Sequence, residues 1–312
     1  MELNKFERFK STVLKSVGEV IVGKQREIEL IMVGFLAQGH MLIEDMPGTG
    51  KTMMVKAFSK TLNLPFKRIQ FTPDLLPSDI TGINFYNQKE MIFEFREGPI
   101  FGNIVLTDEI NRATPRTQSA LLEAMGERQI TADGTTRQLS KPFMVLATQN
   151  PVESYGTFPL PEAQLDRFFM RIKFGFPTVE EEKLIILRNI KNPLDAIEDK
   201  IEVEDIHDLI EAVNQVRIDD DVMNYLVNIV HGTRNREEVL LEVSPRGSIA
   251  LFKACQGYAA LNGRDYIMPE DVKYLAPFIL NHRISVRGIN TIEASIDYVK
   301  KLVDEITVPI EG

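Results

Sequence analysis

A glycine-rich segment at residues 45–52, Asp-Met-Pro-Gly-Thr-Gly-Lys-Thr, could bind the phosphates of a nucleotide. It follows a short apolar run and precedes a helical pattern, which is the context that such a loop requires. Gly48 and Gly50 let backbone N–H groups face phosphate oxygens, and Lys51 supplies positive charge for the β and γ groups. The Thr52 hydroxyl is a suitable ligand for Mg²⁺. The segment therefore predicts a site for ATP or GTP. The residues expected to contact the nucleotide here are Pro47, Gly48, Thr49, Gly50, Lys51, Thr52 and Met53.

Asp45 stands where the general pattern has glycine. A carboxylate beside a phosphate would repel it unless the side chain pointed away. The effect of Asp45 on nucleotide affinity is therefore left open. The alternative for the whole segment is a glycine turn that only joins a strand to a helix.

Two adjacent carboxylates end a second apolar run, Ile104–Glu109. Its length and β-branched content predict a buried strand of a parallel sheet, whose carboxyl end is where ligands bind in open α/β folds. Asp108 would hold Mg²⁺ together with Thr52, and Glu109 would polarise the attacking water. The alternative is a solvated helix cap.

Two further polar residues follow other predicted elements. Asn150 comes just after an apolar strand and could hold the attacking water, although an Asn-Pro pair is equally good turn chemistry. Arg167 ends a helical segment just before the next strand, where a surface ion pair is the alternative.

Composition narrows the class of protein. The chain has 312 residues, a net charge of −9 and one cysteine, Cys255. The acidity argues against a broad nucleic-acid surface, and the cysteine count excludes an internal disulfide framework. No stretch approaches the length of a membrane span, and the N-terminus lacks a signal-peptide core. We expect a cytoplasmic protein without membrane insertion. The four histidines lack ligand spacing, so no protein-built metal site is predicted.

The elements that position these residues fall into two parts. Residues 1–176 alternate strand-like and helical runs, which predicts a parallel sheet covered by helices. The predicted strands are 41–44, 67–71, 104–108, 143–148 and 170–174, and the predicted hairpins are 84–95 and 129–139. Residues 177–312 show helical periodicity in five segments and no further strand. The expected fold is thus a three-layer αβα core followed by an all-α domain.

Taken together, these motifs resemble the AAA+ superfamily of P-loop ATPases and, within it, the MoxR family. The resemblance covers nearly the whole chain. The segments that carry it are 45–52, 70–82, 107–113, 118–125, 147–151, 160–168 and 244–247.

The resemblance implies roles for particular residues. Asn150 takes the place of sensor 1, and Arg167 takes that of the arginine finger, which acts on the γ-phosphate of a neighbouring subunit. Arg246 matches sensor 2, an arginine of the helical lid that contacts phosphate. Val22 and Gly23 match the adenine-side loop, which favours ATP over GTP. The implied assembly is a ring, usually a hexamer.

The resemblance also implies a function. MoxR-type ATPases use ATP-driven motion to remodel or mature a partner, typically a protein with a von Willebrand factor A domain, and some assist metal or cofactor insertion. The two hairpins match family inserts and would contact the client, although they could also be solvent-exposed decoration.

Two other functions compete with this one. A DNA motor or loader uses a similar core, but the net charge and the lack of a nucleic-acid module weigh against it. A switch that binds ATP and hydrolyses it only with a partner present fits the same residues. The sequence does not name the client.

Overall fold

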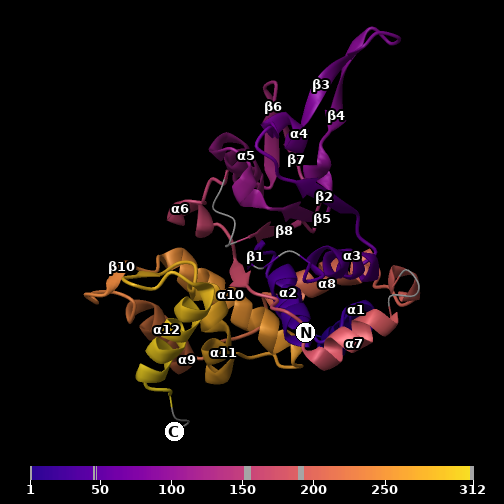
Figure 1. Ribbon diagram of the computed structural model, residues 1–312. Helices are drawn as coiled ribbons and strands as arrows, with labels where there is room; N and C mark the ends of the chain where they lie inside the picture. The colour runs from indigo at the N-terminus through magenta and orange to yellow at the C-terminus, as the bar shows by residue number, and fades with distance from the viewer. Residues whose placement is uncertain (1, 45, 47, 151–155, 189–192, 310–312) are drawn as a thin grey trace.

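The computed structural model describes residues 2–44, 46, 48–150, 156–188 and 193–309. Its centre is a five-stranded parallel sheet in which each predicted strand is present, with ends displaced by at most two residues (Figure 1). The strand order is β2 (Phe66–Gln70), β5 (Ile104–Asp108), β8 (Met144–Gln149), β1 (Met41–Glu44) and β9 (Met170–Ile172).

Side-chain alternation explains why both faces of the sheet are covered. In β5, Ile104 and Leu106 join one buried cluster, whereas Val105 joins another on the opposite face. The first cluster includes α1 (Leu3–Val20), α2 (Gln25–Leu36) and α3 (Lys51–Thr61), and the second includes α5 (Pro115–Glu127). The three-layer αβα core predicted from the sequence is confirmed.

His40, directly before β1, forms hydrogen bonds with both the sheet and helix α5. Its Nδ1 accepts from the Val145 amide at 3.0 Å, so Nε2 carries the proton and donates to the Met125 carbonyl of α5, also at 3.0 Å. Burial lowers the pKa of His40 to about 4. The ring is therefore neutral at neutral pH.

Two antiparallel hairpins interrupt the core, as predicted. The first, β3 (Gly82–Asn87) with β4 (Ile92–Glu97), follows the short helix α4 (Pro77–Thr81) and projects far from the body (Figure 1). The second, β6 (Gln129–Ala132) with β7 (Thr135–Gln138), follows α5.

The rest of the chain is mainly helical. Its helices are α7 (Val179–Arg188), α8 (Val203–Val213), α9 (Asp220–His231), α10 (Pro245–Leu261), α11 (Pro269–Leu280) and α12 (Ile292–Glu305). The expectation of no strand after residue 177 is wrong, because β10 (Val239–Leu241) pairs with β11 (Ser285–Val286). Strands of two or three residues are too short to show alternation in the sequence. The division at residues 176 and 177 stays a prediction.

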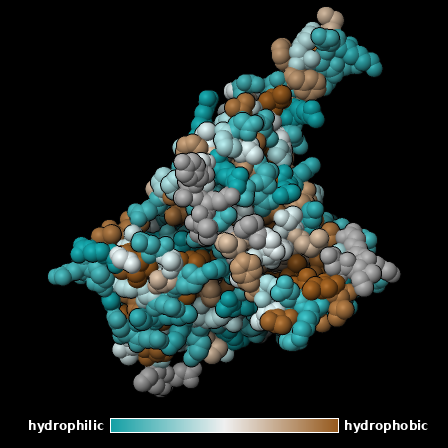
Figure 2. All heavy atoms as spheres, in the orientation of Figure 1, coloured by the Kyte–Doolittle hydropathy of each residue, from teal (hydrophilic) through white to brown (hydrophobic). Residues whose placement is uncertain are grey.

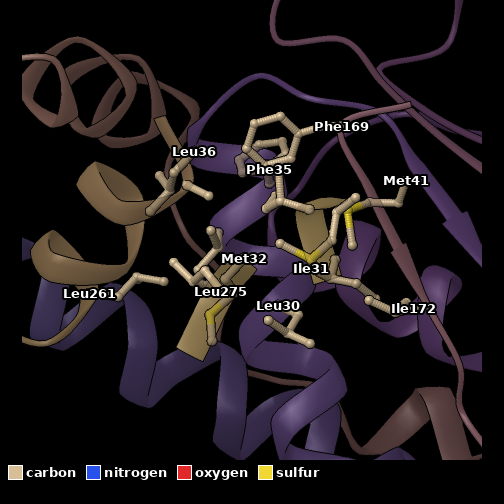
Figure 3. Close-up of a cluster of buried hydrophobic side chains, with 14 of the residues drawn as sticks. Leu30, Ile31, Met32, Phe35, Leu36, Met41, Phe169, Ile172, Leu261 and Leu275 are labelled. Carbon is tan, nitrogen blue, oxygen red and sulfur yellow. The ribbon is translucent and has the colours of Figure 1, made fainter. Parts of the chain in front are cut away.

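The two parts share one apolar core. In Figure 3, Leu30, Ile31 and Phe35 of α2 lie in a cluster with Met41 and Ile172 of the sheet and with Leu261 and Leu275 of α10 and α11. The helical part is thus packed directly on the layer that supports β1. None of the helices in the described ranges is long and apolar enough to span a membrane.

Candidate active site

The glycine-rich loop joins β1 to α3. Gly48 and Gly50 have φ values of +86° and +85°, a left-handed conformation that strains any residue with a Cβ. A Cβ on Gly48 would meet no atom within 4 Å, and one on Gly50 would meet only Ile21 Cδ1, at 3.9 Å. The loop therefore leaves open space beside the start of α3, where free backbone N–H groups favour anions. Asp45 and Pro47, both considered above, lie outside the described residues.

The predicted phosphate-binding side chains begin α3. Lys51 Nζ donates to the Met46 carbonyl at 2.7 Å, and Thr49 Oγ1 donates to the same oxygen at 3.4 Å. Thr52 and Met53 follow in the first turn of the helix, both half-buried. The Lys51 ammonium is thus held against its own loop.

An apolar pocket adjoins the loop. Ile21 and Val22 line it from the segment after α1, Met53 lines it from α3, and Ile185 of α7 lies on its wall. Its position beside Gly48 and Gly50 suits a planar base whose phosphates lie on the loop.

Gly23 lies in the chain between two residues that line this pocket, Val22 and Lys24, and has a left-handed conformation with φ +74°. A Cβ there would overlap the Glu181 carboxylate, which bonds the Thr178 amide at 2.7 Å at the start of α7. Ile185 and Arg188, which also line the pocket, were not predicted as site residues. Their helix shows a continuous apolar run in the sequence, which gives no sign of a ligand.

Asp108 is the last residue of β5 and its side chain is mostly buried. Arg68 Nε of β2 donates to Oδ2 at 2.6 Å, and Thr148 Oγ1 of β8 donates to Oδ1 at 3.3 Å. A guanidinium therefore places positive charge on the predicted metal ligand. One carboxylate and one hydroxyl, those of Asp108 and Thr52, form a donor set of the kind that fits Mg²⁺, because this ion takes few protein ligands when phosphates are present.

Glu109 leaves the strand in a left-handed conformation with φ +57°. Its amide donates to Thr148 Oγ1 at 3.0 Å, and its Oε2 accepts from Gln70 Nε2 at 2.9 Å and lies 3.1 Å from Arg112 Nε. A non-glycine residue in this region is uncommon and is often found at functional sites. The carboxylate is held at the end of the strand by Gln70 and Arg112.

Arg68, Gln70 and Thr148 were not predicted as site residues. They reach the acidic pair because β2 and β8 flank β5. Gln70 and Thr148 belong to the motifs that carried the family resemblance, which was the only signal for them.

The register of the sheet places Asn150 between the loop and the acids. β8 pairs with β1 on one side, with Gln149 opposite Glu44, and with β5 on the other, with Ala147 opposite Thr107. Asn150 follows directly and is 8% exposed. Lys51, Asp108, Glu109 and Asn150 thus come to one edge of the sheet.

The two arginines predicted to contact phosphate form their hydrogen bonds away from the glycine-rich loop. Arg167 is exposed, and its Nη1 donates to the Leu122 carbonyl of α5 at 2.8 Å. Arg246, at the start of α10, donates from Nη1 to Asp166 Oδ2 at 3.2 Å. In this structure both arginines bond groups outside the loop and the acidic pair.

The parallel sheet, the glycine-rich loop and the paired carboxylates beside it define a P-loop ATPase with a helical lid. In agreement, a model of the ATPase family associated with various cellular activities (AAA) matches residues 40–170, and an AAA lid domain model matches residues 231–299.

Individual relatives narrow the assignment. Chaperone MoxR1 of Mycobacterium tuberculosis is 40% identical over 277 residues, covering 86% of this chain and 73% of that protein. The YeaC protein of Bacillus subtilis, itself uncharacterized, is 51% identical over 301 residues, covering 96% and 94% of the two chains. A crystal structure of a candidate ATPase from Cytophaga hutchinsonii is 37% identical, covers 98% of each chain and superposes with a TM-score of 0.89. The chain belongs to the MoxR family of AAA+ ATPases.

Proposed function

We propose that this ATPase works as a homo-oligomeric ring, with a hexamer as the expected form, and that ATP hydrolysis drives it to remodel or mature a partner protein. The observation that supports this most is the position of Arg167. Its side chain is exposed, and within the described part of the chain its guanidinium donates to the Leu122 carbonyl of α5. An arginine in that position is available to the γ-phosphate of an adjacent subunit.

Within one subunit the residues at the sheet edge divide the chemistry. Lys51 leaves the Met46 carbonyl and neutralises the β and γ phosphates, because a phosphate is a far stronger partner for an ammonium than a carbonyl is. Val22 and Gly23 border the base, and Arg246 contacts phosphate from the lid.

Glu109 and Asn150 position the attacking water. Glu109 accepts its proton, and the bonds from Gln70 and Arg112 set the direction of that carboxylate. Thr52 and Asp108 would hold Mg²⁺, which when bound screens phosphate charge and orients the phosphate oxygens.

Subunit mixing tests the ring and the role of Arg167 together. An Arg167→Ala subunit has an intact nucleotide site but no arginine finger to offer its neighbour. A Lys51→Ala subunit has an intact finger but cannot bind the phosphates of ATP in its own site. Each variant alone should be nearly inactive. In an equal mixture about a quarter of the sites pair an intact loop with an intact finger from the next subunit, so about a quarter of wild-type turnover should return. No recovery, in mixtures shown to form mixed rings, would contradict action between subunits.

The dependence of turnover on protein concentration gives a second test. Turnover per subunit should rise from near zero to a plateau as the ring assembles. Substantial turnover by demonstrated monomers would exclude the ring mechanism, and an absence of turnover at every concentration would favour the switch that a partner must activate.

The partner proposed is a protein with a von Willebrand factor A domain, with metal or cofactor insertion as one form of the maturation. The β3–β4 hairpin is the proposed contact. Met91 and Phe93 are 75% and 74% exposed there, and the tilted rings of Tyr86 and Phe93 lie 5.2 Å apart between centroids. Hydrophobic residues are visible among the polar ones along the projecting hairpin (Figure 2). Apolar side chains gathered on a projecting hairpin are typical of an interaction site.

A cytoplasmic location and the absence of a nucleic-acid partner remain proposals. Both follow from the composition and charge given above. If DNA stimulated ATP turnover in a salt-sensitive manner, the second of them would be wrong.

A further inference from the structure

Two side chains of the edge strand β2 connect the two acids of the site. Arg68 Nε donates to Asp108 Oδ2 at 2.6 Å, and its Nη2 donates to Gln70 Oε1 at 3.1 Å. Gln70 Nε2 in turn donates to Glu109 Oε2 at 2.9 Å. Arg68 and Gln70 are two positions apart in β2, so they lie on the same face of the sheet. One guanidinium therefore reaches Asp108 directly and Glu109 through Gln70.

The register of the sheet explains why these groups meet. Gln70 pairs with Asp108 across the parallel strands β2 and β5, and Glu109 follows at the end of β5. The carboxyl ends of parallel strands lie at one edge of a sheet, and this edge also carries the glycine-rich loop that follows β1. The connected side chains thus lie at the same end of the sheet as the candidate nucleotide site.

The two ends of this connection fix the orientation of the Gln70 amide. A guanidinium can only donate hydrogen bonds, and an ionised carboxylate can only accept them. The amide oxygen of Gln70 therefore faces Arg68, and its NH₂ group faces Glu109. Without the guanidinium, this amide would be anchored by Glu109 alone. The Glu109 carboxylate would then lose a donor that is held in place from the other side.

Arg68 also changes the charge around Asp108. The Asp108 side chain is 11% exposed, and Thr148 Oγ1 donates to its other oxygen at 3.3 Å. A carboxylate has about four lone-pair sites, so these two bonds leave room for a cation or for a water bound to one. A divalent cation there would share Asp108 with the guanidinium, and their positive charges repel each other. Arg68 is therefore expected to lower the affinity of Asp108 for such a cation.

The alternative is an ordinary surface ion pair. The Arg68 side chain is 49% exposed, and exposed pairs contribute little to stability. The guanidinium of Arg68, however, is divided between two partners that both belong to the site of the proposed reaction. Its exposure has a practical consequence, because substitutions at Arg68 should leave the fold intact.

We propose that Arg68 is a positioning residue that couples the predicted metal ligand Asp108 to the proton acceptor Glu109. It holds the Glu109 carboxylate in place through Gln70, and it weakens the binding of a divalent cation at Asp108. This inference rests on the proposed roles of Asp108 and Glu109, and it adds a residue that acts on both.

The first test is Arg68→Gln in the full-length protein, with two separate measurements. Mn²⁺, which suits the same oxygen ligands as Mg²⁺, is titrated into the complex with ADP and followed by its paramagnetic resonance. The Kd for Mn²⁺ should fall by about 3- to 10-fold, because one positive charge beside Asp108 has been removed. ATP turnover should fall by about tenfold, because Glu109 is less well placed. A merely structural role would weaken Mn²⁺ binding and turnover together, and that result would overturn the proposal.

Arg68→Lys separates the charge from the shape of the guanidinium. Lysine keeps the positive charge, so the Kd for Mn²⁺ should stay within about twofold of wild type. Its ammonium lacks the planar fork that spans two partners, so turnover should fall by about fivefold. Wild-type turnover in both Arg68 variants would contradict the coupling. Arg217→Gln is the matched control, because it removes an arginine from an exposed ion pair with Asp265 at 2.9 Å, and it should alter neither quantity.

A second background checks the route through Gln70. Gln70→Met keeps a side chain of similar length but lacks the amide. In this background Arg68→Lys should cause no further loss of turnover, because the connection to Glu109 is already broken. Arg68→Gln should still tighten Mn²⁺ binding there, because Arg68 contacts Asp108 directly. A further fivefold loss of turnover from Arg68→Lys in this background would overturn the route.

Glu109→Gln distinguishes failure of the coupling from failure of the proposed function. If this variant retains wild-type turnover, the proposed role of Glu109 fails. If it loses turnover while both Arg68 variants hydrolyse ATP as wild type does, only the coupling fails.

Discussion

Replacing Glu109 with glutamine tests the assignment of the residue that activates water. The change removes one negative charge and keeps the length and shape of the side chain. The amide can still accept from Gln70, and the backbone bond to Thr148 is untouched. What is lost is the proton-accepting carboxylate together with its contact to Arg112.

The structure predicts a large effect of Glu109→Gln on turnover and small effects on stability and ATP affinity. Positioned acid–base groups contribute about 10²- to 10⁴-fold to a rate, so turnover should fall by that factor. The Glu109 side chain is 27% exposed, and its Arg112 partner is more exposed still. The change in the free energy of unfolding should therefore stay below about 1 kcal/mol. ATP affinity should change by no more than about threefold, because Glu109 follows the end of β5 and is not part of the loop that holds the phosphates.

The assay pairs steady-state ATP turnover with equilibrium binding of a fluorescent ATP analogue and with urea unfolding. Glu270→Gln, an exposed change of the same kind at the start of α11, is the matched control and should resemble wild type in all three. Wild-type turnover in Glu109→Gln would refute the assignment of Glu109. Loss of binding together with turnover would mean that the side chain supports the loop instead.

Three other outcomes are expected. Gly23→Ala should weaken ATP binding, because a Cβ at φ +74° costs about 1–2 kcal/mol. If this strain falls on the bound state, the Kd for ATP should rise by about tenfold in a binding titration. Stability should decrease as pH falls from about 6.5 towards 4, by up to about 1.4 kcal/mol per pH unit from His40, because the unfolded histidine takes up a proton that the folded one, with its pKa of about 4, excludes. Met91→Ser combined with Phe93→Ser should abolish stimulation or binding by the partner while basal turnover stays within about twofold of wild type, because the hairpin tip lies far from the sheet edge.

Each of these has its own check. Gly18→Ala is the control for Gly23→Ala, because Gly18 lies inside α1 and an added Cβ there would meet nothing within 4 Å. This variant should have a free energy of unfolding equal to or slightly above that of wild type. A His40→Gln variant whose stability falls as steeply with acid as that of wild type would contradict the role given to His40. Unchanged partner binding by the double serine variant would remove the hairpin from the interface.

Local sequence patterns were enough to predict the strands, loop and helix that carry the site. The β1–loop–α3 unit and the strand that ends in Asp108 were predicted because each is a short contiguous segment with its own periodicity and turn chemistry. The hairpin at 129–139 was predicted from its Asp133-Gly134 turn for the same reason. The short strands β10 and β11 were missed because a pairing between residues more than forty positions apart leaves no such pattern.

The partners of the site residues were beyond sequence reasoning. Arg68 bonds a carboxylate 40 positions away, and Asp166 bonds arginines 80 and 117 positions away. Arginine and aspartate are common on surfaces, so their presence in the sequence does not indicate which of them meet.

The sequence by itself determined that this chain has a phosphate loop, an acidic strand end and a helical lid, because these are encoded by residues close together in the chain. The tertiary structure alone decided that the acids are held by β2 and β8, that α7 completes the apolar pocket, and that Asp166 joins the finger segment to the lid. Those contacts follow from strand order and from the docking of the helices on a shared core. Both depend on the burial of apolar surface by the whole chain rather than on any local signal.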